Sequence, residues 1–79
     1  MNEVILYGRP GCHLCDVMKQ VILEVGQRRP LNLHIKNILD DPADYHRYRY
    51  EIPVLLVNGR EVARHRLTAE TLEASLASQ

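Results

Sequence analysis

Glu3-Val-Ile-Leu-Tyr7, Gly8-Arg-Pro-Gly11 and Cys12-His-Leu-Cys15 follow one another near the start of the chain. The first segment is apolar and rich in β-branched residues, and the second is a cluster of turn formers, so together they predict a buried strand that ends in a loop. Beyond the loop, apolar residues recur at steps of three and four, at Leu14, Val17, Met18, Val21, Ile22 and Val25. This spacing predicts one face of a helix, which Gly26 and Pro30 end.

Cys12 falls at the predicted N-terminus of this helix. Unpaired backbone N–H groups and the positive end of the helix dipole favour negative charge there, so we expect the Cys12 thiolate to be stabilised relative to its thiol. Cys15 comes three residues later on the same side of the first turn, within reach of a mixed disulfide formed at Cys12. The pattern therefore predicts a redox-active pair, with Cys12 as the nucleophile and Cys15 as the resolving thiol.

Other interpretations of the Cys-His-Leu-Cys spacing stay open at this point. The pair could be half of a site for zinc or copper(I), with or without His13, or two unrelated core cysteines. One such pair supplies too few ligands for a metal, and the other histidines, His34, His46 and His65, are scattered along the chain. The redox interpretation is therefore favoured, and no metal is expected.

Two residues beside the cysteines are candidates for contact with a substrate. Arg9, three residues before Cys12, could add positive potential or bind a carboxylate, or it could be merely solvated. His13 could carry a positive charge that favours the thiolate, or it could be a solvated residue of the first turn.

The middle of the chain predicts one further strand and one short helix. Leu31-Asn-Leu-His-Ile35 alternates apolar and polar residues, as a half-buried strand does, with His34 facing solvent. Asp40-Asp41-Pro42 forms an acidic cap with Pro at the first helical position, which predicts a helix from Pro42 to about Tyr48.

The C-terminal third predicts a hairpin and a last helix. The run from Ile52-Pro53 to Val57 is a strand that opens with Pro, and Asn58-Gly59 is a two-residue turn that returns Glu61 to Arg64 as an edge strand. Thr68 can cap a final helix whose narrow apolar stripe is Ala69, Leu72, Leu76 and Ala77. The predicted order is β-α-β-α-β-β-α, in which the first two strands are parallel and the hairpin extends the same sheet.

Composition excludes several classes of function. Ten Lys and Arg balance ten Asp and Glu over 79 residues, which fits one small domain, residues 1–79. The longest apolar runs have four residues each, far short of the roughly 20 that cross a bilayer, so no membrane span is expected. Zero net charge and the lack of Phe and Trp offer no surface for nucleic acid. No signal-peptide pattern opens the chain, and we expect a cytoplasmic monomer.

Together these segments resemble a glutaredoxin-like protein of the thioredoxin-like superfamily over essentially the whole chain. The residues that carry the resemblance are the strand Val4–Tyr7, the motif Gly11–Asp16, and Ile52-Pro53 before a strand that ends in Asn58-Gly59. The resemblance implies an α/β fold with a four-stranded mixed sheet and helices on both faces.

The resemblance also implies roles for individual residues. Pro53 would be a cis proline packed beside Cys12, the backbone of Ile52 would pair with an extended thiol substrate, and Arg9 would bind a glutathione carboxylate. Two positions depart from the family pattern. His13 replaces the familiar Pro after the first Cys, and residues 64–68 replace a Gly-Gly and an acidic pair. Of these, Arg64, His65 and Arg66 could hold a carboxylate by charge or form a solvated turn.

The activity that the resemblance implies is thiol–disulfide exchange. The substrates would be protein disulfides or glutathione mixed disulfides, and the electron donor would be glutathione or a thioredoxin-reductase-type partner. No bound cofactor is expected, because the electrons reside in the two sulfurs. The alternatives are a soft-metal binding protein and a thioredoxin-like interaction module whose dithiol is idle.

Overall fold

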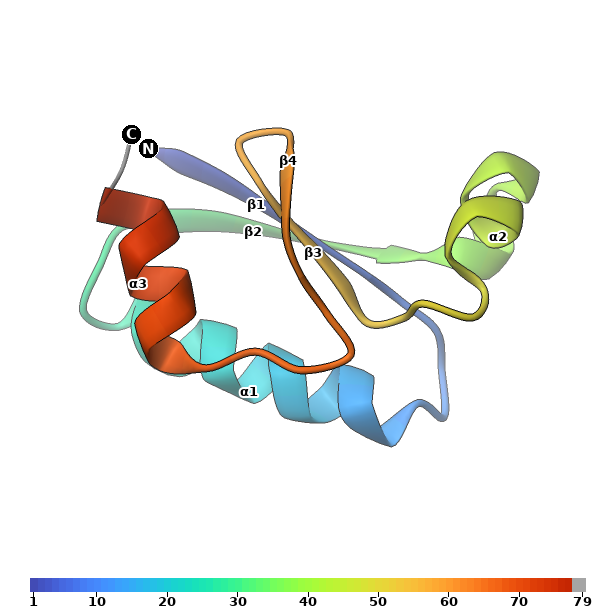
Figure 1. Ribbon diagram of the computed structural model, residues 1–79, viewed down its shortest axis with the longest axis horizontal. Helices are drawn as coiled ribbons and strands as arrows, with labels where there is room; N and C mark the ends of the chain where they lie inside the picture. The colour runs from blue at the N-terminus through green and yellow to red at the C-terminus, as the bar shows by residue number, and fades with distance from the viewer. Residues whose placement is uncertain (78–79) are drawn as a thin grey trace.

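A four-stranded mixed sheet in the order β2-β1-β3-β4 forms the centre of the fold (Figure 1). The computed structural model describes residues 1–77, and residues 78–79 of the predicted domain lie outside the described part. The strands are β1 (Asn2–Gly8), β2 (Leu31–Asn37), β3 (Val54–Val57) and β4 (Arg60–Arg64). The helices are α1 (His13–Gly26), α2 (Pro42–Tyr48) and α3 (Ala69–Ala77), with a single 3₁₀ turn, η1 (Ile38–Asp40), before α2.

The strand directions confirm the predicted order. β1 and β2 are parallel and joined through α1, whereas β3 is antiparallel to both β1 and β4. Asn58 and Gly59 between β3 and β4 have φ angles of 50° and 84°, as a type I′ hairpin turn requires. Sequence reasoning therefore located the hairpin correctly, and it missed only η1 among the described elements.

Two apolar clusters lie on opposite faces of the sheet, because successive side chains of a strand point to opposite faces. One cluster joins Val4 and Leu6 of β1 to buried residues of α1 and α3. The other joins Ile5 and Tyr7 to Ile38 of η1 and Tyr48 of α2. The expectation of helices on both faces is thus confirmed, with α1 and α3 side by side on one face (Figure 1).

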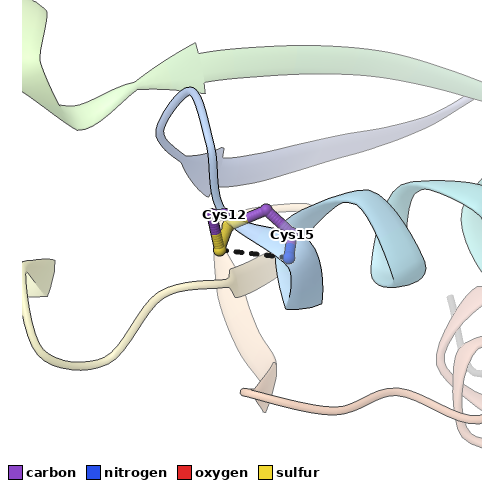
Figure 2. The surroundings of a disulfide bond; sticks show 2 residues. All are labelled: Cys12 and Cys15. Carbon is purple, nitrogen blue, oxygen red and sulfur yellow. Dashed lines mark hydrogen bonds between the residues drawn. A yellow bond between two sulfur atoms is a disulfide. The ribbon is translucent and has the colours of Figure 1, made fainter.

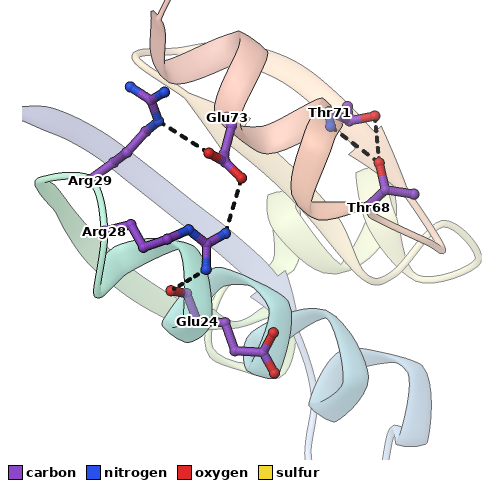
Figure 3. Close-up of polar contacts among 6 residues, drawn as sticks. All are labelled: Glu24, Arg28, Arg29, Thr68, Thr71 and Glu73. Atoms are coloured by element: carbon purple, nitrogen blue, oxygen red, sulfur yellow. Dashed lines mark hydrogen bonds and ion pairs between the residues drawn. The ribbon is translucent and has the colours of Figure 1, made fainter.

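Polar contacts tie α3 to the end of α1 (Figure 3). Glu73 of α3 accepts from Arg28 at 3.0 Å and from Arg29 at 3.3 Å, just beyond the last turn of α1. At the start of α3, the Thr71 N–H donates to Thr68 Oγ1 at 3.1 Å, so Thr68 is the predicted cap. The two ion pairs of Glu73 hold the last helix against the helix that carries the cysteines.

Three details of the sequence prediction are wrong. Gly8 is the last residue of β1 and not part of the turn. Val17 is 47% exposed although it shares the apolar spacing of α1, because it borders an open hollow between α1 and residues 65–68. Ile35 is 54% exposed although it was predicted on the buried side of its strand, because it borders an open cavity of about 310 Å³ that Leu6 and Lys19 also line.

The longest helix of residues 1–77 is α1, whose 14 residues fall short of the roughly 20 that a membrane span needs.

Replacing Ile22 with Ala should destabilise the fold by about 2–5 kcal/mol, because this side chain is fully buried between α1 and the sheet. The free energy of unfolding in urea measures the loss. Leu23→Ala is the matched control, since Leu23 is 43% exposed on the same helix and should cost far less. Equal losses in the two variants would contradict the described core.

Glu73 should make stability depend on pH. Its contacts with Arg28 and then Arg29 lower the pKa of the Glu73 carboxyl below its ordinary value of 4.5. The folded state therefore favours the ionised form of Glu73 over the protonated form more than the unfolded chain does. The stabilisation is full above about pH 5.5 and is lost as the pH falls through the lowered pKa. Unfolding midpoints from pH 3 to 7 for the native protein and Glu73→Gln should converge at the acidic end.

Glu70→Gln is the control for this measurement, because Glu70 lies on the same helix and makes no ion pair within residues 1–77. If the unfolding midpoints of the native protein and Glu73→Gln differed by the same amount at every pH, the ion pairs would contribute nothing to the pH dependence of stability. The convergence should also weaken in high salt, since all three side chains are solvent-accessible.

Candidate active site

Cys12 is the N-cap residue of α1, as the sequence predicted. Its backbone is extended, with φ −93° and ψ 107°, while its carbonyl already accepts the N–H of Asp16 at 3.2 Å. Its sulfur accepts the backbone N–H of Cys15 at 3.2 Å (Figure 2). The sulfur thus takes the place that a Ser or Asp oxygen occupies at most helix starts, where an otherwise unpaired N–H stabilises negative charge.

The two sulfurs differ in their access to solvent. Cys12 and Cys15 are joined by a disulfide in this structure, with their Cα atoms 5.2 Å apart (Figure 2). Cys12 is half-buried, whereas only 7% of Cys15 is exposed. Cys12 is therefore the more exposed of the two residues, although an open cavity of about 310 Å³ also borders Cys15.

Gly8 provides the space that Cys15 occupies. A Cβ atom placed on Gly8 would lie 2.9 Å from the Cys15 sulfur and 3.2 Å from its Cβ, closer than real side chains approach. Sequence reasoning missed this role because Gly8 was assigned to the turn with Gly11. Gly11 has a φ of 79° and does serve the turn, but Gly8 is a buried strand residue that allows a close approach.

The Ile52–Pro53 peptide bond is cis, as the resemblance implied. The Pro53 carbonyl accepts the N–H of His65 at 2.8 Å, so the start of β3 is bonded to the end of β4. The Ile52 N–H donates to the carbonyl of Tyr48 at 3.1 Å. A substrate that pairs with Ile52 through this N–H therefore has to displace an existing hydrogen bond.

The basic residues of the motif and of the β4–α3 connection fall into two groups. Arg9 and His13 are exposed and make no ion pair within residues 1–77. Arg9 also borders the cavity of about 310 Å³ that reaches Cys15.

Arg64, by contrast, is paired with two carboxylates of the protein. It forms an ion pair with Glu61 and a second one with Glu51 at 3.0 Å, and these carboxylates raise the pKa of its guanidinium. His65 lies 3.6 Å from the same Glu51 and adopts a φ of 68°, a left-handed conformation that favours glycine.

Within residues 1–77, no group of three or more His, Cys, Asp and Glu side chains is arranged to hold a metal ion. The histidines outside the motif have other neighbours. His34 is 2.8 Å from Glu3, His65 faces Glu51, and His46 lies edge-on to the ring of Tyr45.

Known structures share this fold. Protein Ne2328 of Nitrosomonas europaea is 26% identical to this chain, covers 95% of it with 91% of its own length, and superposes with a TM-score of 0.83. Protein XcR50 of X. campestris is 31% identical, with coverage of 96% of this chain and 97% of its own and a TM-score of 0.80. Oxidised mitochondrial thioredoxin 3 of Saccharomyces cerevisiae is 15% identical, and the match covers 99% of this chain and 78% of the thioredoxin. Its TM-score is 0.68, which is a likeness of fold alone.

The family comparison covers nearly the whole chain. The model of the Glutaredoxin-like domain (DUF836) matches residues 3–77, which include the cysteine pair, the cis proline and every described helix and strand except Asn2, the first residue of β1. The chain belongs to this glutaredoxin-like family and has a thioredoxin-like fold.

Proposed function

We propose that the protein is a thiol–disulfide oxidoreductase that reduces protein disulfides or glutathione mixed disulfides. The observation that carries the proposal is the hydrogen bond from the Cys15 N–H to the Cys12 sulfur at the start of α1. A backbone donor aimed at this sulfur stabilises its thiolate, and the thiolate is the form that attacks disulfides. The family comparison and the accessible position of Cys12 support the same activity.

The reaction proceeds in two exchange steps. The Cys12 thiolate attacks one sulfur of the substrate disulfide, a Cys12–substrate disulfide forms, and the other substrate sulfur leaves as a thiolate that takes a proton from water. Cys15 then gives up its proton and attacks the Cys12 sulfur, which expels the second substrate sulfur. The substrate gains two electrons and the protein ends with the Cys12–Cys15 disulfide. Two thiols of glutathione, or one dithiol of a reductase, return those electrons.

Four residues around the cysteines complete the proposed site. Arg9 and His13 would attract a substrate carboxylate, because both are exposed and without ion-pair partners in the described chain. Ile52 and Pro53 would lie along the extended backbone of the substrate beside Cys12. The reaction needs no bound cofactor, since two sulfurs carry the electrons.

The proposed setting is that of a cytoplasmic monomer that acts on proteins. Its partners would be disulfide-containing or glutathionylated proteins and an electron donor, with no nucleic acid and no membrane among them. Zero net charge over the 79 residues supports this proposal, because polyanion binding needs clustered positive charge.

Separate replacement of the two cysteines tests the mechanism. Cys12→Ser should abolish the reduction of insulin disulfides, because it removes the attacking sulfur. Cys15→Ser should accumulate a mixed disulfide at Cys12, because nothing resolves it. Intact-protein mass spectrometry detects the trapped adduct, and iodoacetamide alkylation rates between pH 4 and 10 should show the lower thiol pKa at Cys12. Equal and unperturbed alkylation rates at the two cysteines, or full activity in Cys12→Ser, would refute the mechanism.

Gly8→Ala should slow the second step and spare the first. The added methyl group meets the Cys15 sulfur at 2.9 Å, so Cys15 has to move away from its attacking position. We expect the mixed disulfide at Cys12 to resolve roughly tenfold more slowly, equivalent to about 1.4 kcal/mol in the barrier. Quenched-flow mass spectrometry measures the rate of each step.

Gly26→Ala is the control for this variant, because a Cβ on Gly26 meets its nearest neighbour, Leu31, only at 3.7 Å. It should leave both steps at the native rate. Native resolution rates in Gly8→Ala would show that the close approach of Gly8 and Cys15 has no part in catalysis.

A further inference from the structure

The sheet has two edge strands, β2 and β4, which differ in how open they are to another chain. The register between β3 and β4 shifts between Leu55 and Leu56, and β4 carries charged side chains at positions 60, 61 and 64. Such irregularities and charges oppose the pairing of a further strand. β2 pairs with β1 in an unbroken register along its seven residues, Leu31–Asn37. Its outer edge therefore offers backbone N–H and C=O groups to an incoming strand.

The side of β2 that faces α1 is apolar and only partly covered. Leu31, Leu33 and Ile35 alternate along the strand, so their side chains lie on the same face of the sheet. Ile35 is 54% exposed, and Leu31 and Leu33 are half-buried. These two leucines border a hollow of about 450 Å³ against α1, where Leu23 leaves 43% of its surface exposed. We call it the leucine hollow, and an aliphatic side chain placed in it would bury apolar surface of all three leucines.

Lys19 lies one turn before Leu23 on α1. Its side chain is half-buried and lines the cavity of about 310 Å³ together with Ile35. The charged residues that line this cavity form no ion pair with one another; they are Arg9, Asp16, Lys19, Lys36 and Asp40. The Lys36 ammonium lies 6.0 Å from the ring centroid of Tyr7, which belongs to the apolar cluster on the opposite face of the sheet. Lys19 is thus the ammonium on the α1 side that an acidic group lying along β2 would complement.

We propose that β2 binds an extended segment of a partner protein as a fifth strand, with an acidic side chain at Lys19 and an aliphatic side chain in the leucine hollow. Backbone hydrogen bonds to β2 supply affinity in this mode of binding, and the side chains supply specificity. Every second side chain of a strand lies on the same face. The acidic and aliphatic residues of the segment are therefore separated by two or four positions, as Leu33 and Leu31 are from Ile35.

A second copy of this chain is the alternative occupant of the β2 edge. β2 contains no acidic residue, so a second β2 has no carboxylate to offer Lys19. An antiparallel pair of β2 strands centred on His34 would also place two imidazoles directly opposite each other. The charge of Lys19 therefore favours a different protein as the partner.

Labelled peptides without cysteine test the proposal independently of thiol chemistry. The first is fluorescein-Thr-Glu-Thr-Val-Thr-Leu-Thr, and the second has the reverse order, because the segment can run parallel or antiparallel to β2. In two control versions of each peptide, Lys replaces Glu, or Ser replaces both Val and Leu. Fluorescence anisotropy with the oxidised protein gives the dissociation constants. We expect one of the two orders to bind at least tenfold more tightly than both of its control versions.

Three variants separate the charge from the apolar hollow. Lys19→Glu should reverse the preference between the Glu and Lys peptides, and Lys19→Arg should keep the native preference. Leu23→Ser should reduce the advantage of the aliphatic peptide over the Ser version severalfold without reversing the charge preference. Arg60→Glu is the matched control, because Arg60 is exposed on the other edge strand. It should keep the native preference, and thermal melting checks that every variant is folded.

N-methylation of the peptide tests the backbone pairing itself. Successive N–H groups of a strand point to its two opposite sides, so only one alternate set faces β2. Methyl groups on that set should abolish binding, whereas methyl groups on the other set should preserve most of it. Amide hydrogen exchange measured by NMR should slow at alternate residues of β2 when the tighter peptide is bound.

Equal affinities for all the peptides, or a charge preference that Lys19→Glu leaves unchanged, would overturn the proposed partner segment. Equal effects of the two N-methylated sets, or unchanged exchange along β2, would overturn the added strand. Sedimentation that shows a dimer of the native protein, abolished by Ile35→Lys, would overturn the proposal in favour of a second copy. None of these results bears on the proposed oxidoreductase activity, because the peptides contain no sulfur.

Discussion

The proposed chemistry depends on a single backbone donor at the start of α1. The Cys15 N–H would have no partner within the helix, and the Cys12 sulfur accepts it at 3.2 Å. Because this donor belongs to the peptide backbone, no side chain has to be positioned to supply it. The same turn that holds the donor also brings the second sulfur within bonding distance of the first. Stabilisation of a thiolate and its later capture by a neighbour are thus consequences of one helix start.

The rest of the fold keeps that helix start in place. Met18, Ile22 and Val25 anchor α1 to the sheet, and α3 packs beside it through Leu72 and Leu76. Gly8 then allows β1 to pass so close to the motif that the Cys15 sulfur lies where a side chain would otherwise be. The result is a buried sulfur beside an accessible one. A small domain with a thin core can maintain this asymmetry because the strand, the helix and the motif are adjacent in sequence.

Charge is distributed unevenly in a chain whose net charge is zero. Arg28, Arg29 and Arg64 are each paired with carboxylates, and these pairs join elements of the fold. Arg9 and Arg66 have no such pair within the described residues. Lys19, Lys36, Arg47, Arg49 and Arg60 also make no ion pair within the described residues, so positive charge without a carboxylate partner is spread over several elements and is not confined to the neighbourhood of the cysteines.

The sequence by itself determined the order of elements, the position of Cys12 at a helix start and the hairpin at Asn58-Gly59, because each follows from residues within a few positions of one another. It also led to the glutaredoxin-like family through motifs at fixed separations. Only the tertiary structure decided that Gly8 makes room for Cys15, that Val17 is exposed, and that Arg64 is neutralised while Arg66 is not. Each of these facts depends on which distant segment packs against the residue. Local periodicity carries no information about that neighbour, because it records the face of an element and not what covers it.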